Sequence, residues 1–265
     1  MTYCGVDIGA RSIEVVLYDG AQIVDALVTD TGNSPIENGR RAFSQALGSA
    51  GIRRSDLDGI VATGYGRNYF QDADRSCSEI ICHARGVSYF FPGAGTVIDI
   101  GGQDSKLIEL DSEGRPTDFV MNDRCAAGTG RFIEMAGGIL GIPVSEMNGR
   151  VSPDAGSVDI SSMCAVFAES EIVGLLQGGC GTDVILNGIF QAVARRTLSM
   201  AGRARIRDLV VFTGGVAQLE GVMYALRDET GLDIVSPPDP RITGALGAAI
   251  AASESREGRP VFLSG

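Results

Sequence analysis

The feature that most constrains this sequence is an internal repeat of an apolar strand followed by a glycine turn. Residues 4–9 read Cys-Gly-Val-Asp-Ile-Gly, and residues 96–102 read Thr-Val-Ile-Asp-Ile-Gly-Gly. In each copy a polar turn, a second apolar run and another turn follow. Both copies therefore predict a strand, a glycine turn and a second strand, with Asp7 and Asp99 at the same place in the two units.

After each repeat the apolar residues adopt a helical spacing. We predict helices over residues 36–51, 130–140, 165–177, 183–201 and 243–249, and further strands over residues 59–62 and 208–212. Alternation of strands and helices predicts an α/β fold. We place the boundary between two lobes at residue 94, giving lobes 1–94 and 95–265, with the final helix able to pack back on the first lobe.

Composition and charge exclude several classes of partner. The chain has 265 residues and a formal net charge of −11, which argues against binding to nucleic acid. The first residues lack a charged segment followed by an apolar one, and no apolar stretch approaches the length of a membrane span. We therefore expect a cytoplasmic protein without a membrane partner.

The glycine turns predict a nucleotide site. A glycine turn directly after a strand lets backbone N–H groups approach phosphate oxygens. Asp7 and Asp99 at the strand ends would hold Mg²⁺, which needs few carboxylates. A third turn, Thr213-Gly214-Gly215, suits a base or ribose. A single glycine turn is usually an ordinary β-turn, but three in this order are hard to explain that way.

Gln103 directly follows the second glycine turn. A glutamine at such a position can orient the attacking water in a nucleotide hydrolase. The alternative interpretation is a polar turn residue.

Two of the six cysteines lie just before or at the start of predicted helices, namely Cys125 and Cys164. Helix N-termini favour thiolates and anionic clusters. A cubane cluster usually needs four thiolates, so two cysteines per chain would suffice only where two chains meet on a two-fold axis. Taken alone, a cysteine among small residues is more often a buried core residue.

The other cysteines carry weaker signals. Cys77, Cys82 and the neighbouring His83 could form a metal site, although a buried helix is the simpler interpretation. Cys4 in the first strand and Cys180 in a glycine-rich loop are expected to be structural.

Five segments carry a resemblance to a known family. They read ATGYGR (62–67), VIDIGGQDSK (97–106), MNDRCAAGTGRF (121–132), SSMCAVFAESE (161–171) and TGGVAQ (213–218). With them the chain closely resembles the activator (archerase) family of 2-hydroxyacyl-CoA dehydratases, which includes the ATP-binding subunits of benzoyl-CoA reductases. That family lies within the actin, hsp70 and sugar-kinase superfamily, and the resemblance covers nearly the whole chain.

The resemblance implies an actin-like ATPase with two RNase H-like lobes and nucleotide in the cleft between them. It implies catalytic roles for Asp7, Asp99 and Gln103. The nucleotide-binding residues that it implies are Gly9, Ala10, Arg11, Ser12, Gly101, Gly102, Asp104, Gly214, Gly215, Val216 and Gln218.

The same resemblance implies the cofactors and partners. These are ATP or ADP, Mg²⁺, and one [4Fe–4S] cluster held by Cys125 and Cys164 from each protomer of a homodimer. In the family, ATP binding and hydrolysis alter the angle between the helices beside the cluster and drive single electrons into a CoA-ester dehydratase or reductase. Ferredoxin or flavodoxin would be the electron donor. The motifs leave the client enzyme open.

One segment departs from the family pattern. The first phosphate loop contains Ala10 and Arg11, where many relatives have Ser or Thr and then a Lys further on. We expect Ser12 and Arg11 to supply phosphate contacts. Glu14 would be unfavourable beside ATP, so its side chain is expected to point outward.

Three other functions remain open. A small-molecule kinase of the same superfamily would give no role to Cys125 and Cys164. An ATP-switched assembly protein would contain no iron. A heteromeric reductase subunit would share its cluster with a related but different chain.

Overall fold

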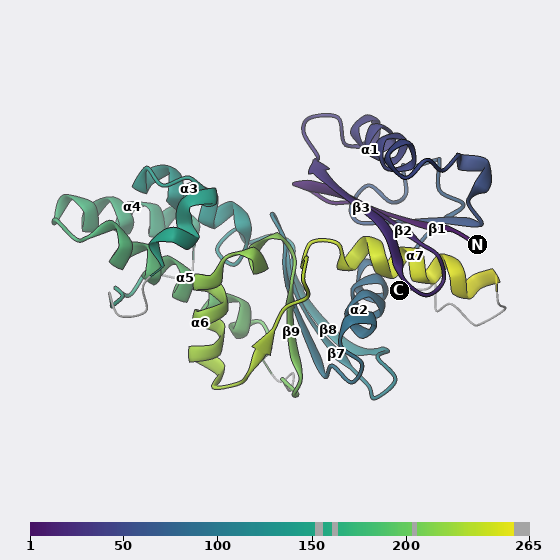
Figure 1. Ribbon diagram of the computed structural model, residues 1–265. Coiled ribbons are helices and arrows are strands. Elements are labelled where there is room, and N and C mark those ends of the chain that lie inside the picture. Colours follow the sequence, from purple (N-terminus) through teal and green to yellow (C-terminus); the bar gives the residue numbers. More distant parts are fainter. Residues whose placement is uncertain (152–155, 161–163, 203–205, 257–265) are drawn as a thin grey trace. The chain divides into compact units, whose positions relative to one another are not determined.

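The computed structural model of the chain contains two mixed β-sheets with associated helices (Figure 1). It describes residues 1–151, 156–160, 164–202 and 206–256. The chain divides into two compact units, the first formed by residues 1–95, 110–117 and 237–265 and the second by residues 96–109 and 118–236. The lobe boundary after residue 94 stays a prediction, and the compact units differ from it in residues 110–117 and 237–265.

The first unit contains a five-stranded sheet in the order β3-β2-β1-β4-β5. Its strands are β1 (Tyr3–Ile8), β2 (Ser12–Tyr18), β3 (Ile23–Asp30), β4 (Gly59–Thr63) and β5 (Arg75–Ser76). The first three strands are antiparallel neighbours, and β4 pairs in parallel with β1 and β5. The helices of this unit are α1 (Pro35–Ala50), the short 3-10 helix η1 (Arg54–Asp56), α2 (Glu79–Phe90) and α7 (Thr243–Arg256).

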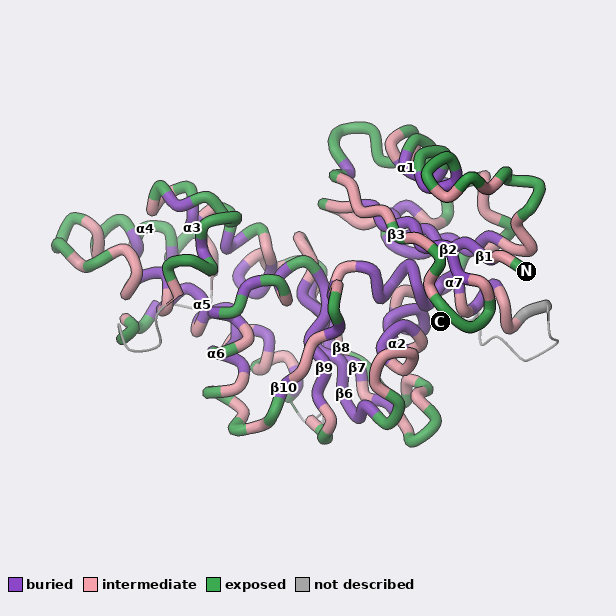
Figure 2. Tube along the Cα trace, viewed as in Figure 1, coloured by how far each residue is buried: buried purple, intermediate pink, exposed green. Residues whose placement is uncertain are grey.

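Helices cover both faces of this sheet because both faces of its central strands are apolar. Val6 and Val15 share one buried cluster with Phe43 of α1, while Val16 shares the opposite cluster with Ala245 of α7. Burial follows this arrangement along β1, β2, α2 and α7 (Figure 2). A Cβ at Gly247 would lie 1.7 Å from the carbonyl oxygen of Cys82, so α7 packs on α2 at a distance that only glycine permits.

The second unit contains a sheet in the order β10-β9-β6-β7-β8. Its strands are β6 (Thr96–Ile100), β7 (Ser105–Leu110), β8 (Pro116–Asn122), β9 (Val210–Thr213) and β10 (Ile234–Val235). Its helices are α3 (Gly130–Leu140), η2 (Val144–Arg150), α4 (Ala165–Gln177), α5 (Thr182–Ser199), η4 (Gly215–Gln218) and α6 (Glu220–Thr230). One large apolar cluster, which includes Phe132, Phe190 and Phe212, joins these helices to the sheet.

The internal repeat appears as two β-hairpins with matching registers. In β1–β2, Asp7 lies opposite Glu14, and in β6–β7, Asp99 lies opposite Lys106. The same turn hydrogen bond closes both, since Gly9 N–H donates to the Ser12 carbonyl at 3.0 Å and Gly101 N–H donates to the Asp104 carbonyl at 2.9 Å. The strand, glycine turn and second strand predicted for both copies are therefore confirmed.

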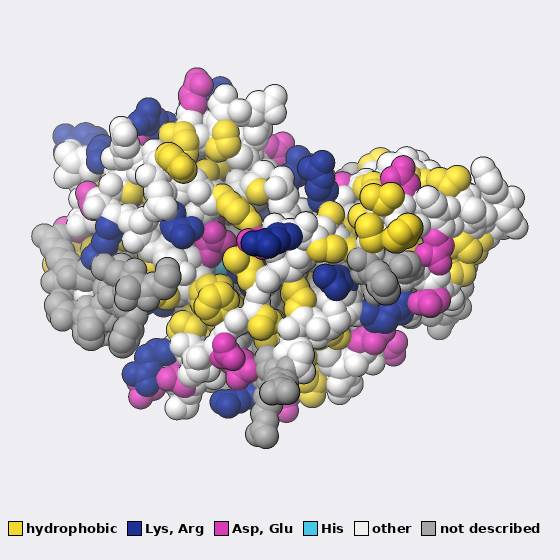
Figure 3. Space-filling view, turned by 180° about the vertical axis from the view of Figure 1, so that it is seen from behind, with side chains coloured by type: hydrophobic (Ala, Val, Ile, Leu, Met, Phe, Trp, Pro, Cys, Tyr) yellow, Lys and Arg dark blue, Asp and Glu magenta, His cyan; other side chains and the backbone are white. Residues whose placement is uncertain are grey.

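Charged side chains of both signs are interspersed over the face drawn in Figure 3. None of the helices in the described part of the chain combines the length and apolarity that a membrane crossing requires.

Candidate functional site

In the first unit, Asp7 lies at the carboxyl end of β1, immediately before the first glycine turn. Its side chain is 8% exposed. The turn that follows reaches the surface, with Arg11 exposed and Gly9, Ala10 and Ser12 half-buried. The backbone of this turn is therefore accessible to a ligand, as the sequence requires of a phosphate loop.

Two glycines border the Asp7 carboxylate. A Cβ at Gly64 would lie 2.3 Å from Asp7 Oδ1, and a Cβ at Gly244 would lie 2.1 Å from Oδ2. Gly64 also has φ +82°, which side chains rarely adopt. The carboxylate therefore needs glycine on both sides, from the turn after β4 and from the first turn of α7.

Glu14 corrects one expectation. Its side chain points inward and is 4% exposed, opposite Asp7 in the hairpin. Burial raises the pKa of Glu14 well above its usual value, and the negative charge of Asp7 raises it further, against the opposing effect of Arg241. The outward position was expected because a charged Glu14 would repel phosphate. Strand alternation instead places its side chain on the same face as Asp7, where the raised pKa favours the neutral acid.

Arg241 is a cation close enough to Glu14 to influence its pKa. Its guanidinium is fixed by Asp239 through two hydrogen bonds of 2.9 and 2.8 Å. Asp239 first, and then Glu14, raise the pKa of Arg241.

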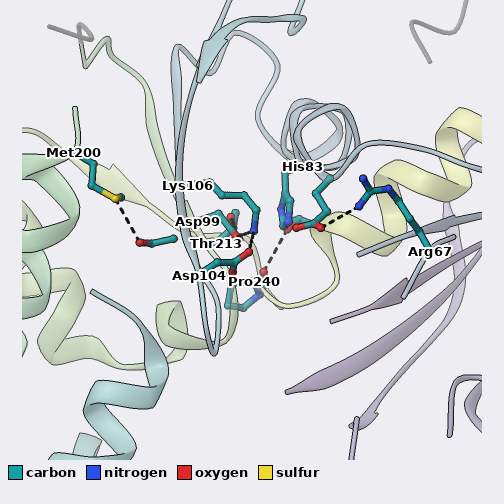
Figure 4. A network of polar contacts seen from close by, with 11 residues as sticks. Arg67, His83, Asp99, Asp104, Lys106, Met200, Thr213 and Pro240 are labelled. Carbon is teal, nitrogen blue, oxygen red and sulfur yellow. Dashed lines mark hydrogen bonds and ion pairs between the residues drawn. The ribbon is translucent and has the colours of Figure 1, made fainter. Parts of the chain in front are cut away.

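In the second unit, Asp99 takes the place that Asp7 has in the first, but its neighbours differ (Figure 4). The Lys106 ammonium, which is 2% exposed, lies 2.7 Å from Asp104 Oδ2 and 3.4 Å from Asp99 Oδ2. The Thr213 hydroxyl donates to Asp99 Oδ1 at 2.9 Å. This buried ion triad was not identified from the sequence, although Lys106 ends one of the motifs that carry the family resemblance.

The second glycine turn is hydrogen-bonded to a helix. The N–H groups of Gly130 and Arg131, the first two residues of α3, donate to the carbonyls of Gly101 and Gly102 at 2.9 Å each. Gly101 and Gly102 are half-buried, and Gln103 is exposed at the outside of the turn. The turn and the start of α3 therefore form one connected backbone structure.

The third glycine turn follows β9. Gly214, with φ +87°, lies against the end of β6, because a Cβ there would be 2.4 Å from the Ile100 carbonyl oxygen. Helix η4 then exposes Gly215 and Gln218 and buries Val216. The Gln218 carbonyl accepts a hydrogen bond from Asn148 Nδ2 at 2.8 Å.

The third turn has a counterpart in the first unit. Thr63 pairs with Asp7 in the parallel register of β4 and β1, as Thr213 pairs with Asp99 in β9 and β6. Each threonine is followed by a glycine of positive φ, Gly64 or Gly214. The Thr-Gly dipeptide shared by ATGYGR and TGGVAQ was the available signal, and sequence reasoning gave the first of these motifs no role.

Cys125 and Cys164 belong to the second unit, and both are half-buried free thiols. Cys164 is the residue immediately before α4. Cys125 lies in a turn closed by Asn122, whose Oδ1 accepts from Cys125 N–H at 2.9 Å and whose Nδ2 donates to the Cys125 carbonyl at 2.7 Å. The residues that precede Cys164 in its motif, 161–163, lie outside the described residues.

Three of the other four cysteines differ from these two, whereas Cys180 is half-buried as they are. Cys4, Cys77 and Cys82 are buried, and burial raises the pKa of both Cys4 and Cys82. A hydrogen bond with Cys82 lowers the pKa of Cys77 to about 7. Within the described residues, no group of three or more His, Cys, Asp or Glu side chains could hold a metal ion. Cys77, Cys82 and His83 thus form no metal site there.

Residues 4–252 match the BadF/BadG/BcrA/BcrD ATPase family. The chain belongs to this family. It is 42% identical over 254 residues to the activator of lactoyl-CoA dehydratase from Anaerotignum propionicum, covering 96% of this chain and 98% of the relative. It is 31% identical over 258 residues to one of the subunits of benzoyl-CoA reductase from Thauera aromatica, covering 93% of this chain and 91% of that subunit.

Solved structures agree with this assignment. The activator of the 2-hydroxyisocaproyl-CoA dehydratase from Clostridium difficile with bound ADPNP superposes with a TM-score of 0.90 at 39% identity, covering all of both chains. A ROK family glucokinase from Streptomyces griseus shares the fold alone, with a TM-score of 0.58 at 15% identity over 96% of this chain and all of the glucokinase. The predicted family and the predicted actin-like α/β fold are therefore confirmed.

Proposed function

We propose that this ATPase is an electron-transferring activator, which hydrolyses ATP and delivers low-potential single electrons to a 2-hydroxyacyl-CoA dehydratase or a benzoyl-CoA-reductase-type partner. Membership of the family and the dehydratase activators among its relatives support the partner class. The observation that carries the proposal is the pair of hydrogen bonds joining the Gly101-Gly102 turn to the start of α3. Cys125 lies in the turn just before that helix.

The nucleotide phosphates would be bound by two turns. In the first unit these are Gly9 to Ser12, with Arg11 as an exposed cation, and in the second Gly101, Gly102 and Asp104. Backbone N–H groups in such turns bind phosphate without a net positive charge. Gly214, Gly215, Val216 and Gln218 would contact the adenosine, since η4 presents an exposed glycine and an amide side chain.

Mg²⁺ fits the carboxylates at the strand ends. Asp7 and Asp99 are oxygen donors fixed in position by glycine contacts and, for Asp99, by Thr213 and Lys106. Such hard oxygen ligands suit Mg²⁺, which keeps most of its waters. The exposed Gln103 would orient the attacking water.

A [4Fe–4S] cluster fits Cys125 and Cys164. Both thiols are half-buried and lie before helices of the second unit, where N–H groups and the helix dipole favour thiolates. When bound by four such thiolates, the cluster supplies a one-electron carrier. One chain would contribute two of them, so the complete set requires a second copy.

The surface beside Cys164 supports a homodimer. Val166 and Phe167 in the first turn of α4 are 67% and 69% exposed. Contiguous exposed apolar surface marks interaction sites, and these two side chains are neighbours in the chain. A two-fold interface would bring the same residues of both copies together, and with them two pairs of cysteines. Ferredoxin or flavodoxin would supply the electrons.

In this proposal the nucleotide state reaches the cysteines through backbone contacts. A phosphate bound at Gly101 and Gly102 would shift the carbonyls that hold the first N–H groups of α3. The start of α3 and the Cys125 turn would move with them. The environment of the sulfurs, which sets the reduction potential of such a cluster, would change in turn.

Anaerobic purification with iron and sulfide analysis tests the proposal. We expect about four iron per dimer, lost in both Cys125→Ser and Cys164→Ser. Cys180→Ser is the matched control, because Cys180 is equally half-buried but follows α4 rather than preceding it, and it should retain the iron. ATP binding without iron in any preparation would reject electron transfer and favour a kinase of the same superfamily.

A further inference from the structure

The carboxylates of Asp7 and Asp99 occupy equivalent places, but two hydrogen-bond donors of Asp99 have no equivalent around Asp7. Thr213 donates to Asp99, whereas the hydroxyl of its counterpart Thr63 donates to the Cys77 carbonyl at 3.1 Å. The position of Lys106 is occupied in the first unit by an acid, Glu14. A buried carboxylate needs hydrogen-bond donors to remain charged, so Asp7 must use a different set.

His83 is placed to supply one hydrogen-bond donor to the Asp7 carboxylate. It is the single histidine of the sequence, lies on α2 and is 6% exposed. Its Nε2 lies 3.5 Å from the point that a Cβ of Gly244 would occupy, and Asp7 Oδ2 lies 2.1 Å from the same point. The absence of a side chain at Gly244 therefore leaves the imidazole and the carboxylate together.

Thr243 holds the ring nitrogen of His83 that faces away from Asp7. Its Oγ1 lies 3.2 Å from His83 Nδ1, and its other contact, to the Pro240 carbonyl, is longer at 3.4 Å. The hydroxyl donates its one hydrogen to the Pro240 carbonyl, so its oxygen can accept from Nδ1, while Nε2 is the ring nitrogen on the Asp7 side. Figure 4 shows His83 and Pro240 in this network.

The start of α2, the helix that carries His83, is also fixed in position. Glu79, one helical turn before His83, forms an ion pair of 3.5 Å with Arg67, which in turn donates to the Gly64 carbonyl at 3.1 Å. Arg67 thus joins the start of α2 to Gly64, which borders the other oxygen of Asp7. Both sides of the Asp7 carboxylate are therefore connected to α2.

We infer that His83 is a positioning residue, whose Nε2–H holds the Asp7 carboxylate in the orientation that binds the Mg²⁺ of the nucleotide. The inference rests on the proposed nucleotide function. Partners that orient a metal-binding side chain typically change metal affinity 10- to 100-fold when they are removed. His83 acts through Asp7 and need not touch the nucleotide.

Two amide substitutions of His83 distinguish the contributions of its two ring nitrogens. In His83→Gln the amide nitrogen can reach the position of Nε2, whereas in His83→Asn it reaches only that of Nδ1. The readout is the Mg²⁺ concentration that gives half-maximal binding of a fluorescent ADP analogue, alongside binding in EDTA. We expect His83→Asn to raise this concentration roughly tenfold or more, and His83→Gln to restore most of the affinity.

The controls keep the outcome unambiguous. Binding in EDTA should be equal in wild type and both variants, because His83 acts through the metal ligand. If His83→Asn does not fold, as judged by thermal unfolding, Thr243→Val replaces it and should raise the Mg²⁺ requirement by a smaller factor.

Equal Mg²⁺ dependence in all the folded proteins would overturn the role of His83 while leaving nucleotide binding intact. Wild-type protein that bound no nucleotide would instead reject the proposed function.

Discussion

The two hairpins that begin the sheets share a backbone and differ in charge. Both place an aspartate before a glycine turn, and both close that turn with the same hydrogen bond. Opposite the aspartate, β7 carries Lys106, which forms a buried ion triad, whereas β2 carries Glu14, which is driven towards its neutral form. The two halves of this repeat therefore keep the same backbone geometry but differ in local charge.

Removal of the Lys106 side-chain charge should have the largest effect on the free energy of unfolding. Lys106→Met leaves Asp99 and Asp104 buried without their cation, so we expect a loss of about 3–5 kcal/mol in the free energy of unfolding. Urea unfolding followed by circular dichroism measures it. Arg115→Met, which breaks the exposed Arg115–Asp111 pair, is the control and should leave the free energy of unfolding nearly unchanged. A loss as small as the control would show that the triad contributes little to stability.

Alanine at the equivalent glycines of the two units, Gly64 and Gly214, should have an intermediate effect on the free energy of unfolding. Gly64→Ala and Gly214→Ala place a Cβ against the strand end at positive φ. Gly20→Ala is matched in backbone, with φ +100°, but nothing lies within 4 Å of its Cβ. We expect the first two substitutions to cost about 1–3 kcal/mol more than the third, through overpacking.

Thermal unfolding of the three glycine variants compares these costs. Similar losses at all three positions would show that backbone strain dominates over the close contacts. Different losses at Gly64 and Gly214 would show that the two units tolerate the same change unequally.

Glu14 should produce the smallest effect, and one that depends on pH. Its folded-state pKa is raised, so above the unfolded-state pKa the folded protein holds more protons, and stability falls as pH rises. The slope for one group is at most about 1.4 kcal/mol per pH unit. Glu14→Gln should flatten this dependence above pH 4.5 and stabilise the protein at neutral pH. Urea unfolding between pH 5 and 8 tests it, and parallel curves for the two proteins would contradict a raised pKa.

Sequence reasoning was most successful where a pattern is local. The predicted helices over residues 130–140 and 165–177 coincide with α3 and α4, because apolar spacing and the glycines at their ends are short-range signals. The repeat itself was found because both copies keep the same strand and turn composition. Of the residues expected in a buried helix, Cys82 and His83 lie in α2, whereas Cys77 is buried but precedes that helix.

Part of what the sequence did not reveal depends on contacts between distant residues. Glu14 was expected outward on the ground of its charge, which overlooked the strand alternation that puts it on the face of Asp7, and its proximity to Arg241 is a contact between distant residues. His83 was not assigned a role because its partner Thr243 lies 160 residues away in the chain. Lys106 was missed for another reason: its partners Asp99 and Asp104 are near in sequence, but the motif does not show that all three side chains are buried. The roles of Gln103, Cys125 and Cys164 remain predictions.

The position of α7 has a consequence for the order in which the chain folds. The face of the first sheet that carries Tyr3, Val16 and Val61 is covered by Ala245, Ala249 and Ala252, near the opposite end of the sequence. During synthesis the strands of this face are made first, and the helix that covers it is made only after all of them. The first unit therefore cannot complete its core until the chain has been made as far as α7. Contacts of high sequence separation become the slow step, and the nascent sheet is meanwhile open to association with other chains.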